Sequence, residues 1–118
     1  MKKFFLFLNW PLVGIPQAIN FLGAFLNQLA FAVNGGAMPV HANFCGMRMN
    51  PEDFRHVCMT AATRLKFLCD WIDLGSVILS PGDVLLHFGH LLEVPCFWMW
   101  IVLAGIALHR QSVQSRAK

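Results

Sequence analysis

Four ionisable side chains lie close together within an otherwise apolar stretch of the sequence: Asp83, His87, His90 and Glu93. At about 100° per residue they fall within one arc of roughly 120° on a helix. An ionisable group in a membrane segment is costly unless it is paired, hydrated or bound to a ligand. We therefore expect this stripe to form hydrogen bonds with a loop of the chain or with a neighbouring subunit.

Two other kinds of chemistry stay open for the same stripe. Imidazole ligates haem, chlorophyll-type macrocycles and metal ions, so His87 and His90 are the candidate cofactor ligands. A metal ion needs three or four ligands, and one helix offers two or three. The others would come from His41, His56 or a partner chain, so the sequence predicts no metal site and requires no cofactor. A proton relay along the stripe is the second alternative.

A second polar stripe precedes the first in the sequence, in a segment that carries no charge. Gln17, Asn20, Asn27 and Gln28 fall on one side of a helix together with Ala24. A stripe of amides and small residues faces another helix rather than lipid. These four amides are therefore predicted partner contacts, within the chain or between subunits. The alternative is a polar transport path lined by Gln17, Asn20 and Asn27 in a homo-oligomer.

The middle of the chain contains cysteine and histidine at spacings that match no common zinc site. His41, Cys45, His56 and Cys58 are of the right types for zinc, but we expect loop residues without metal. A disulfide between Cys45 and Cys58 can form only if this segment of the chain faces an oxidising compartment. No G-x-S-x-G motif or glycine-rich phosphate loop occurs. The sequence therefore predicts no enzyme.

The composition indicates a membrane protein. Hydrophobic residues make up 57% of the 118 residues and charged residues 13%, about half of the charge that a soluble domain carries. Such a chain is neither a disordered segment nor an ordinary cytosolic enzyme. The net charge of +3 is not gathered into a basic stripe, so nucleic acid is not an expected partner.

The elements that must position these residues are two predicted transmembrane helices, at about 12–33 and 84–108. A helix over the first range is about 33 Å long, which suits a hydrocarbon core of about 30 Å. Asn34-Gly35-Gly36 ends it, because Asn and Gly tolerate the left-handed backbone of a helix C-cap. Ser80-Pro81-Gly82-Asp83 starts the second helix as a capping box. Pro95 is expected to kink it.

The residues between the two spans, about 34–83, are predicted to form an extramembrane cap. Apolar residues recur at helical spacing from Pro51 to Ile72, which predicts one amphipathic helix or two shorter ones. Phe54, Leu65 and Trp71 would carry its contacts with a neighbouring subunit. The fold class is therefore an all-α membrane protein with two spans and a helical cap.

Charge placement predicts the topology. Lys2 and Lys3 begin the chain, and Arg110, Arg116 and Lys118 end it. The middle segment carries four basic and five acidic residues. By the positive-inside rule, both termini are expected in the cytoplasm, which makes the protein a multi-pass protein of a bacterial cytoplasmic membrane.

Three motifs in this order resemble a family of small bacterial membrane proteins of unknown function. They are an N-G-G-x-M-P-V turn at 34–40, a T-x-L-x-x-L-x-D-x-I stretch at 63–72, and the S-x-G-D helix start at 80–83. The resemblance covers about 29–89. It implies a membrane location and a bacterial source, and it implies no activity.

The functional prediction is a small accessory subunit of a larger bacterial membrane complex, of respiratory or photosynthetic type, that assists assembly or stabilisation. Two short spans bury little against each other, so larger integral membrane subunits and the lipid bilayer are the expected partners. The alternatives are a cofactor-binding subunit that uses His87 or His90 and a homo-oligomeric transporter or channel.

Overall fold

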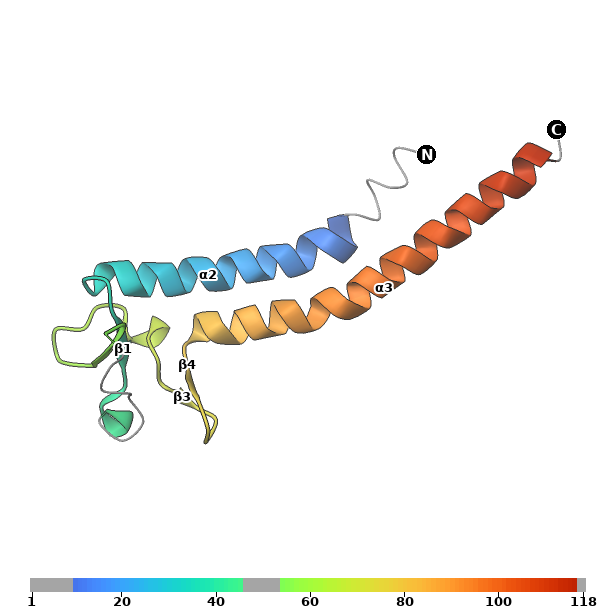
Figure 1. Ribbon diagram of the computed structural model, residues 1–118. Helices are drawn as coiled ribbons and strands as arrows, with labels where there is room; N and C mark the ends of the chain where they lie inside the picture. The colour runs from blue at the N-terminus through green and yellow to red at the C-terminus, as the bar shows by residue number, and fades with distance from the viewer. Residues whose placement is uncertain (1–9, 46–53, 117–118) are drawn as a thin grey trace.

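The computed structural model describes residues 10–45 and 54–116. Two helices, α2 (Ile15–Val33) and α3 (Pro81–Arg116), lie side by side and run in opposite directions (Figure 1). A π-helical turn, η1 (Trp10–Gly14), precedes α2. α3 is about twice as long as α2 and continues past the N-terminal end of α2 (Figure 1).

The C-terminal end of α2 confirms the predicted stop signal. The amide of Gly36 donates to the carbonyl of Phe31 at 3.0 Å, and that of Gly35 donates to the carbonyl of Ala32 at 3.4 Å. This pair of bonds is the Schellman pattern. Both glycines have positive φ, 77° and 83°, a backbone conformation that strains any residue with a Cβ atom. The chain therefore leaves the helix here because of its local sequence.

The predicted capping box at the start of α3 is also confirmed. The backbone amide of Asp83 donates to Ser80 Oγ at 3.0 Å, and the backbone amide of Ser80 donates to Asp83 Oδ2 at 3.0 Å. This reciprocal pair satisfies two amides that the first turn of a helix leaves free. α3 then continues as one helix through Pro95, and it changes direction partway along its length (Figure 1).

The residues between the two helices, 38–45 and 54–80, form a small head at one end of the helix pair (Figure 1). Its elements are the strands β1 (Met38–Val40), β2 (His56–Cys58), β3 (Ile72–Asp73) and β4 (Ile78–Leu79) and the 3-10 turns η2 (Ala42–Phe44) and η3 (Lys66–Leu68). β1 and β2 pair in parallel, and β3 and β4 form an antiparallel pair. An isolated bridge joins Val40 to Asp70.

The predicted amphipathic helix at 51–72 is therefore wrong. Residues 51–53 lie outside the described residues, and from Phe54 onward the chain forms turns, β2 and η3 instead of an α-helix. The physical reason is tertiary: β2 pairs with β1, which is distant in sequence, and this pairing overrides local helical periodicity.

The membrane topology also differs from the prediction. Within the described residues, α3 is the one helix that is long and apolar enough to cross a membrane. α2 has 19 residues, four of them amides, and it does not meet the same requirement of length and hydropathy. The prediction of an all-α protein with two membrane spans is contradicted by this single candidate span, by the two small sheets and by a disulfide in the head.

The small hydrophobic core lies where the head meets the end of α2. Ala30 of α2 packs with Met38, Leu68 and Cys69 of the head, and Leu26, Leu29, Met59 and Leu65 surround this cluster. The Asn34 side chain, at the end of α2, also bonds to the backbone of the head. Its Oδ1 accepts from the amide of Arg64 at 2.9 Å, and its Nδ2 donates to the carbonyl of Arg64 at 3.0 Å. The head is thus fixed to α2 by both packing and hydrogen bonds.

Candidate functional site

The two predicted polar stripes face each other between α2 and α3. Asn27 Nδ2 donates to Asp83 Oδ1 at 2.6 Å, and Ser80 Oγ donates to Asn27 Oδ1 at 2.6 Å. Ser80 Oγ also lies 2.8 Å from Asp83 Oδ2. Hydrogen bonds to an ionised carboxylate are stronger than neutral ones. Asp83 therefore links the capping box to the neighbouring helix.

A second set of polar contacts joins the helices at Glu93. Gln17 Nε2 donates to Glu93 Oε1 at 2.9 Å, and Asn20 Nδ2 donates to the same oxygen at 2.6 Å. His90 Nδ1 lies 3.3 Å from Glu93 Oε2. The amides of Gln17, Asn20 and Asn27 thus contact carboxylates of the same chain, which agrees with the predicted helix-to-helix packing.

Glycine residues allow this close approach of the helices. A Cβ atom placed on Gly23 would lie 2.6 Å from the carbonyl oxygen of Gly82, and one on Gly82 would overlap Asn27 Oδ1. A Cβ atom on Gly89 would overlap Asn20 Oδ1. The backbones therefore meet at positions where only glycine fits, and the amides of α2 lie directly over the glycines of α3.

The candidate cofactor ligands lie on the outside of the helix pair. His87 and His90 are both exposed, and His87 Nδ1 lies 2.8 Å from the carbonyl oxygen of Asp83. The described part of the chain contains no group of three or more His, Cys, Asp or Glu side chains arranged to hold a metal ion. A cofactor at His87 or His90 stays a prediction that this arrangement does not test.

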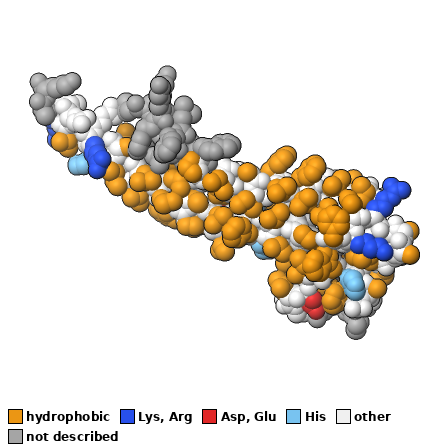
Figure 2. All heavy atoms as spheres, turned by 180° about the vertical axis from the view of Figure 1, so that it is seen from behind, with side chains coloured by type: hydrophobic (Ala, Val, Ile, Leu, Met, Phe, Trp, Pro, Cys, Tyr) orange, Lys and Arg blue, Asp and Glu red, His pale blue; other side chains and the backbone are white. Residues whose placement is uncertain are grey.

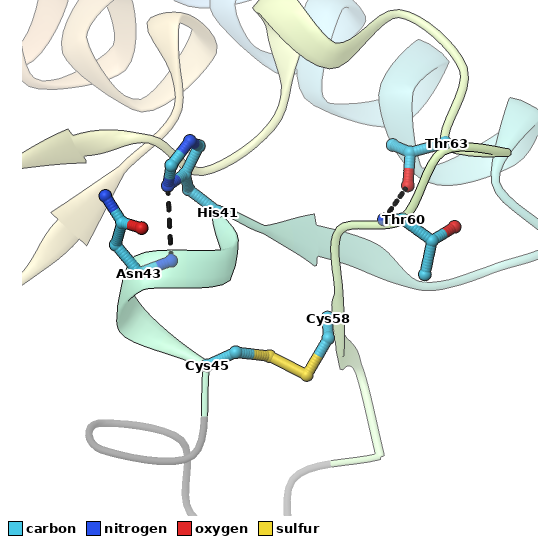
Figure 3. Close-up of a disulfide and its surroundings, with 6 residues drawn as sticks. All are labelled: His41, Asn43, Cys45, Cys58, Thr60 and Thr63. Carbon is cyan, nitrogen blue, oxygen red and sulfur yellow. Dashed lines mark hydrogen bonds between the residues drawn. A yellow bond between two sulfur atoms is a disulfide. The ribbon is translucent and has the colours of Figure 1, made fainter.

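The cysteine pair of the head forms a disulfide. Cys45 follows η2 and Cys58 ends β2, and their Cα atoms are 5.6 Å apart (Figure 3). His41 and Thr60 lie nearby, each with its own local hydrogen bond, from the amide of Asn43 to His41 and from the amide of Thr60 to Thr63 (Figure 3). Cys45 and Cys58, the two cysteines considered above as zinc ligands, are therefore bonded to each other in this disulfide.

The other predicted partner contacts fall at different places. Gln28 is exposed on α2, and Phe54 is 90% exposed in a turn before β2. Leu65 is half-buried beside the core and has a left-handed backbone with φ of 50°. Trp71 is exposed, and its indole nitrogen donates to the carbonyl of Phe67 at 3.0 Å. Phe54 and Trp71 are thus available at the surface, whereas Leu65 supports the fold.

A polar cavity of about 390 Å³ lies where the head meets the two helices. We call it the chamber; it is lined by Ala24, Asn27, Gln28, Phe31, Met38, Arg55, His56, Asp70 and Asp83. These residues come from α2, β1, the turn before β2, β2 itself, the segment after η3 and α3, so the chamber exists only in the folded chain.

Asp70 is the most unusual side chain of the chamber. Its side chain is 7% exposed, and its Oδ2 lies 3.5 Å from His56 Nε2. Within the described residues, its Oδ1 has no hydrogen-bond partner. The pKa of Asp70 is raised to about 6, chiefly by burial and also by the carboxylate of Asp83, whereas His56 acts to lower it. A buried carboxylate with an unsatisfied oxygen is typical of a functional site.

The sequence pattern did not predict Asp70 as a site residue. The helical periodicity places Asp70 on the exposed face of the predicted amphipathic helix, whereas the side chain is buried beside the Val40 bridge. The signal that marked it was the T-x-L-x-x-L-x-D-x-I stretch, in which it is the aspartate. Ser80 was predicted as a cap, and its second role as a donor to Asn27 depends on the packing of the helices.

Comparison with known proteins gives one family and no characterised relative. No curated protein and no solved structure matches the chain. A family model described as a family of unknown function, DUF5317, matches residues 2–95, a range that includes the three motif segments and the chamber. Because this match covers more than half of the chain, the protein belongs to the DUF5317 family.

Proposed function

We propose that the protein is a small accessory subunit of a larger bacterial membrane protein complex, which it helps to assemble or stabilise. The observation that carries this proposal is an apolar surface that extends over both α3 and the head. Figure 2 shows hydrophobic side chains covering one face of the helices and continuing to the head. Apolar surface of this extent marks a contact with lipid or protein.

The first part of this surface is the outer segment of α3, residues 97–108, which lies beyond the glycine contacts with α2. Phe97, Trp98 and Val102 are each more than half exposed there. The run from Leu91 to Leu108 is about 27 Å long as a helix, close to the thickness of a hydrocarbon core. We therefore propose that α3 crosses the bilayer and presents this segment to lipid and to a membrane partner.

The second part lies on the head and supports a protein partner. Phe54 is 90% exposed, Phe67 is 65% exposed, and Leu74 is 62% exposed. These residues lie outside the candidate membrane-spanning helix. Large aromatic side chains are typical of the centres of protein interfaces. A neighbouring subunit that covers both the head and α3 would bury them together.

We propose that the head faces the oxidising side of a bacterial cytoplasmic membrane and that the C-terminal end of α3 faces the cytoplasm. The Cys45–Cys58 disulfide supports the first placement, because disulfides persist in oxidising compartments. Arg110, Arg116 and Lys118 support the second by the positive-inside rule. In a Cys96→Ser background, Ser76→Cys should react with an impermeant maleimide in intact cells, and Ser112→Cys should react only after lysis. The reverse pattern would contradict this orientation.

The accessory role is tested by purification of the tagged full chain from its native membranes in a gentle detergent. Larger membrane subunits should co-purify in fixed stoichiometry. Phe54→Asp should reduce their yield severalfold, because it places a charge in the apolar surface of the head. Ser76→Asp, at an exposed turn of the same head, is the matched control. A chain that purifies alone, with both variants unchanged, would contradict the proposal.

The transporter alternative receives less support. The amides that would line a path, Gln17, Asn20 and Asn27, donate to carboxylates of their own chain. Opening a path along them would break these charge-assisted bonds. Measurement of ion or solute flux in liposomes would separate the two functions, since an accessory subunit should leave the vesicles tight.

A further inference from the structure

The three motif segments that the sequence analysis singled out converge on the chamber. Met38 is the first residue of β1, Asp70 lies in the stretch that follows η3, and Asp83 lies in the first turn of α3. These three residues are distant in sequence. None of them belongs to the apolar surface through which the protein is proposed to contact its partner subunit. We therefore expect a separate function of the chamber that these residues line.

The charge inside the chamber favours a cation. Asp70 and Asp83 supply two carboxylates, against one permanent positive charge, Arg55. His56, the first residue of β2, lies beside Asp70 and is the remaining titratable group of the lining. The repulsion between the two carboxylates, which raises the pKa of Asp70, is relieved by a positive charge placed between them.

The unsatisfied oxygen of Asp70 indicates that the missing group is a hydrogen-bond donor. Asp70 is nine-tenths buried, and its Oδ1 has no partner among the described residues. The terminal torsion of an aspartate is soft, so rotation can turn either oxygen to the chamber. Asp83 already accepts from Asn27 and Ser80 but retains acceptor capacity. Gln28 supplies an amide at the exposed side of the lining.

The size and remaining walls of the chamber favour an organic ammonium over a metal ion. Its volume of about 390 Å³ lies at the lower end of the range for small-molecule pockets. Phe31 and Met38 form apolar walls, and an aromatic ring attracts a cation. No described cluster has the three ligands that a metal ion needs. A primary ammonium group has three donors on one compact charge, which suits acceptors on several sides.

We propose that the chamber binds a primary ammonium group, carried by a small soluble amine or by the headgroup of an aminophospholipid, with Asp70 as its principal acceptor. The carboxylate of Asp83 and the amide of Gln28 complete the contacts. Phe31 and Met38 pack against the carbon atoms next to the nitrogen.

The test is thermal unfolding of the full chain in nanodiscs of phosphatidylcholine, titrated with ethylammonium. The Tm should rise by several degrees once ethylammonium exceeds its Kd about a hundredfold. Tetramethylammonium, which has the same charge but no N–H donor, should give no rise. Asp70→Asn should abolish the effect, whereas Asp73→Asn, an exposed carboxylate on β3, should leave it unchanged.

A second variant, which should gain binding, keeps the test informative if Asp70→Asn fails to fold. Gln28→Glu adds a carboxylate at the exposed side of the chamber and should lower the Kd for ethylammonium severalfold. Gln111→Glu, on the exposed end of α3, should not change it. Loss of binding in one variant and gain in the other cannot both result from general destabilisation.

Discs that contain phosphatidylethanolamine distinguish the two sources of the ammonium group. A rise in Tm that needs this lipid and is lost in Asp70→Asn assigns the chamber to a headgroup. A rise with ethylammonium alone assigns it to a soluble amine, and either result supports the site. No response to either amine would overturn the proposal, as would a response retained in Asp70→Asn or one produced only by Mg²⁺ or Zn²⁺.

Discussion

Asn27 of α2 donates a 2.6 Å hydrogen bond from its side-chain amide to the carboxylate of Asp83 in the first turn of α3. The same carboxylate accepts from the backbone amide of Ser80, and the Ser80 hydroxyl donates to Asn27 Oδ1. One closed network therefore fixes both where α3 begins and how it packs on α2. Because the network is partly buried, each group depends on the others for its partner.

Replacing Asn27 should therefore destabilise the protein more than an ordinary helix substitution. Asn27→Leu leaves Asp83 and Ser80 without a partner on α2, which costs about 1–3 kcal/mol. The measurement is the midpoint of thermal or denaturant unfolding in detergent. Gln28→Leu, an exposed amide one residue further along α2, is the control and should stay within about 0.5 kcal/mol. Equal effects of the two variants would argue against the network.

The glycines of α3 should tolerate no side chain where α2 crosses them. Gly82→Ala and Gly89→Ala place a methyl group on the side-chain oxygens of Asn27 and Asn20, so the helices must separate. We expect a loss of about 1–3 kcal/mol for each. Gly105→Ala meets no atom within 4 Å and should instead stabilise the helix by about 1 kcal/mol. Stabilisation by all three substitutions would contradict the close contact.

The disulfide should contribute measurable stability to the head. Cys45 and Cys58 are separated by 13 residues, and closing a loop of this length stabilises a fold by about 3 kcal/mol. Cys58→Ser should lower the Tm and make it insensitive to reductant, whereas Cys96→Ser, a free cysteine on α3, should keep the reductant sensitivity. Burial and the charge of Asp70 raise the pKa of the Cys69 thiol, so it should label slowly in the folded protein.

The buried Asp70 should make stability depend on pH in the acid range. Its pKa is raised from 3.8 to about 6 in the folded chain, so between these values the native state binds more protons than the unfolded state. Stability should therefore fall as the pH rises from about 4 to about 6, by about 1.4 kcal/mol for each unit of the shift.

Unfolding of the wild type and of Asp70→Asn across this range is the measurement. Asp70→Asn should flatten the decline, because an amide has no carboxyl proton to lose in this range. A decline that is the same in both would show that another group is responsible.

The sequence predicted the C-terminal end of α2 and the start of α3 well because their signals are local. Gly35 and Gly36 provide the left-handed turn that ends α2, and Ser80 and Asp83 form the box that starts α3. The residue types also indicated that both polar stripes need hydrogen-bond partners, but they did not show that the two stripes face each other. These features depend on neighbours within a few residues or on one helical face.

The head could not be predicted in the same way because its order is non-local. β1 pairs with β2 across a long connection, and Val40 bridges to Asp70. A periodicity that matches a helix does not reveal such pairings, and it placed Asp70 at the surface. The first predicted span, about 12–33, failed for a different reason: α2 has 19 residues, four of them amides, and it does not meet the length and hydropathy that a membrane-crossing helix needs.

The central claim is that the outer segment of α3 and the aromatic residues of the head lie against a larger membrane subunit. Photo-crosslinking in native membranes tests it most directly, with a photoreactive residue at Trp98, at Phe54, or at Leu86, which faces Gly23 of α2. Trp98 and Phe54 should give one defined adduct with the same larger protein, and Leu86 should give none. Adducts with lipid alone at Trp98, and no protein adduct at Phe54, would contradict the accessory role.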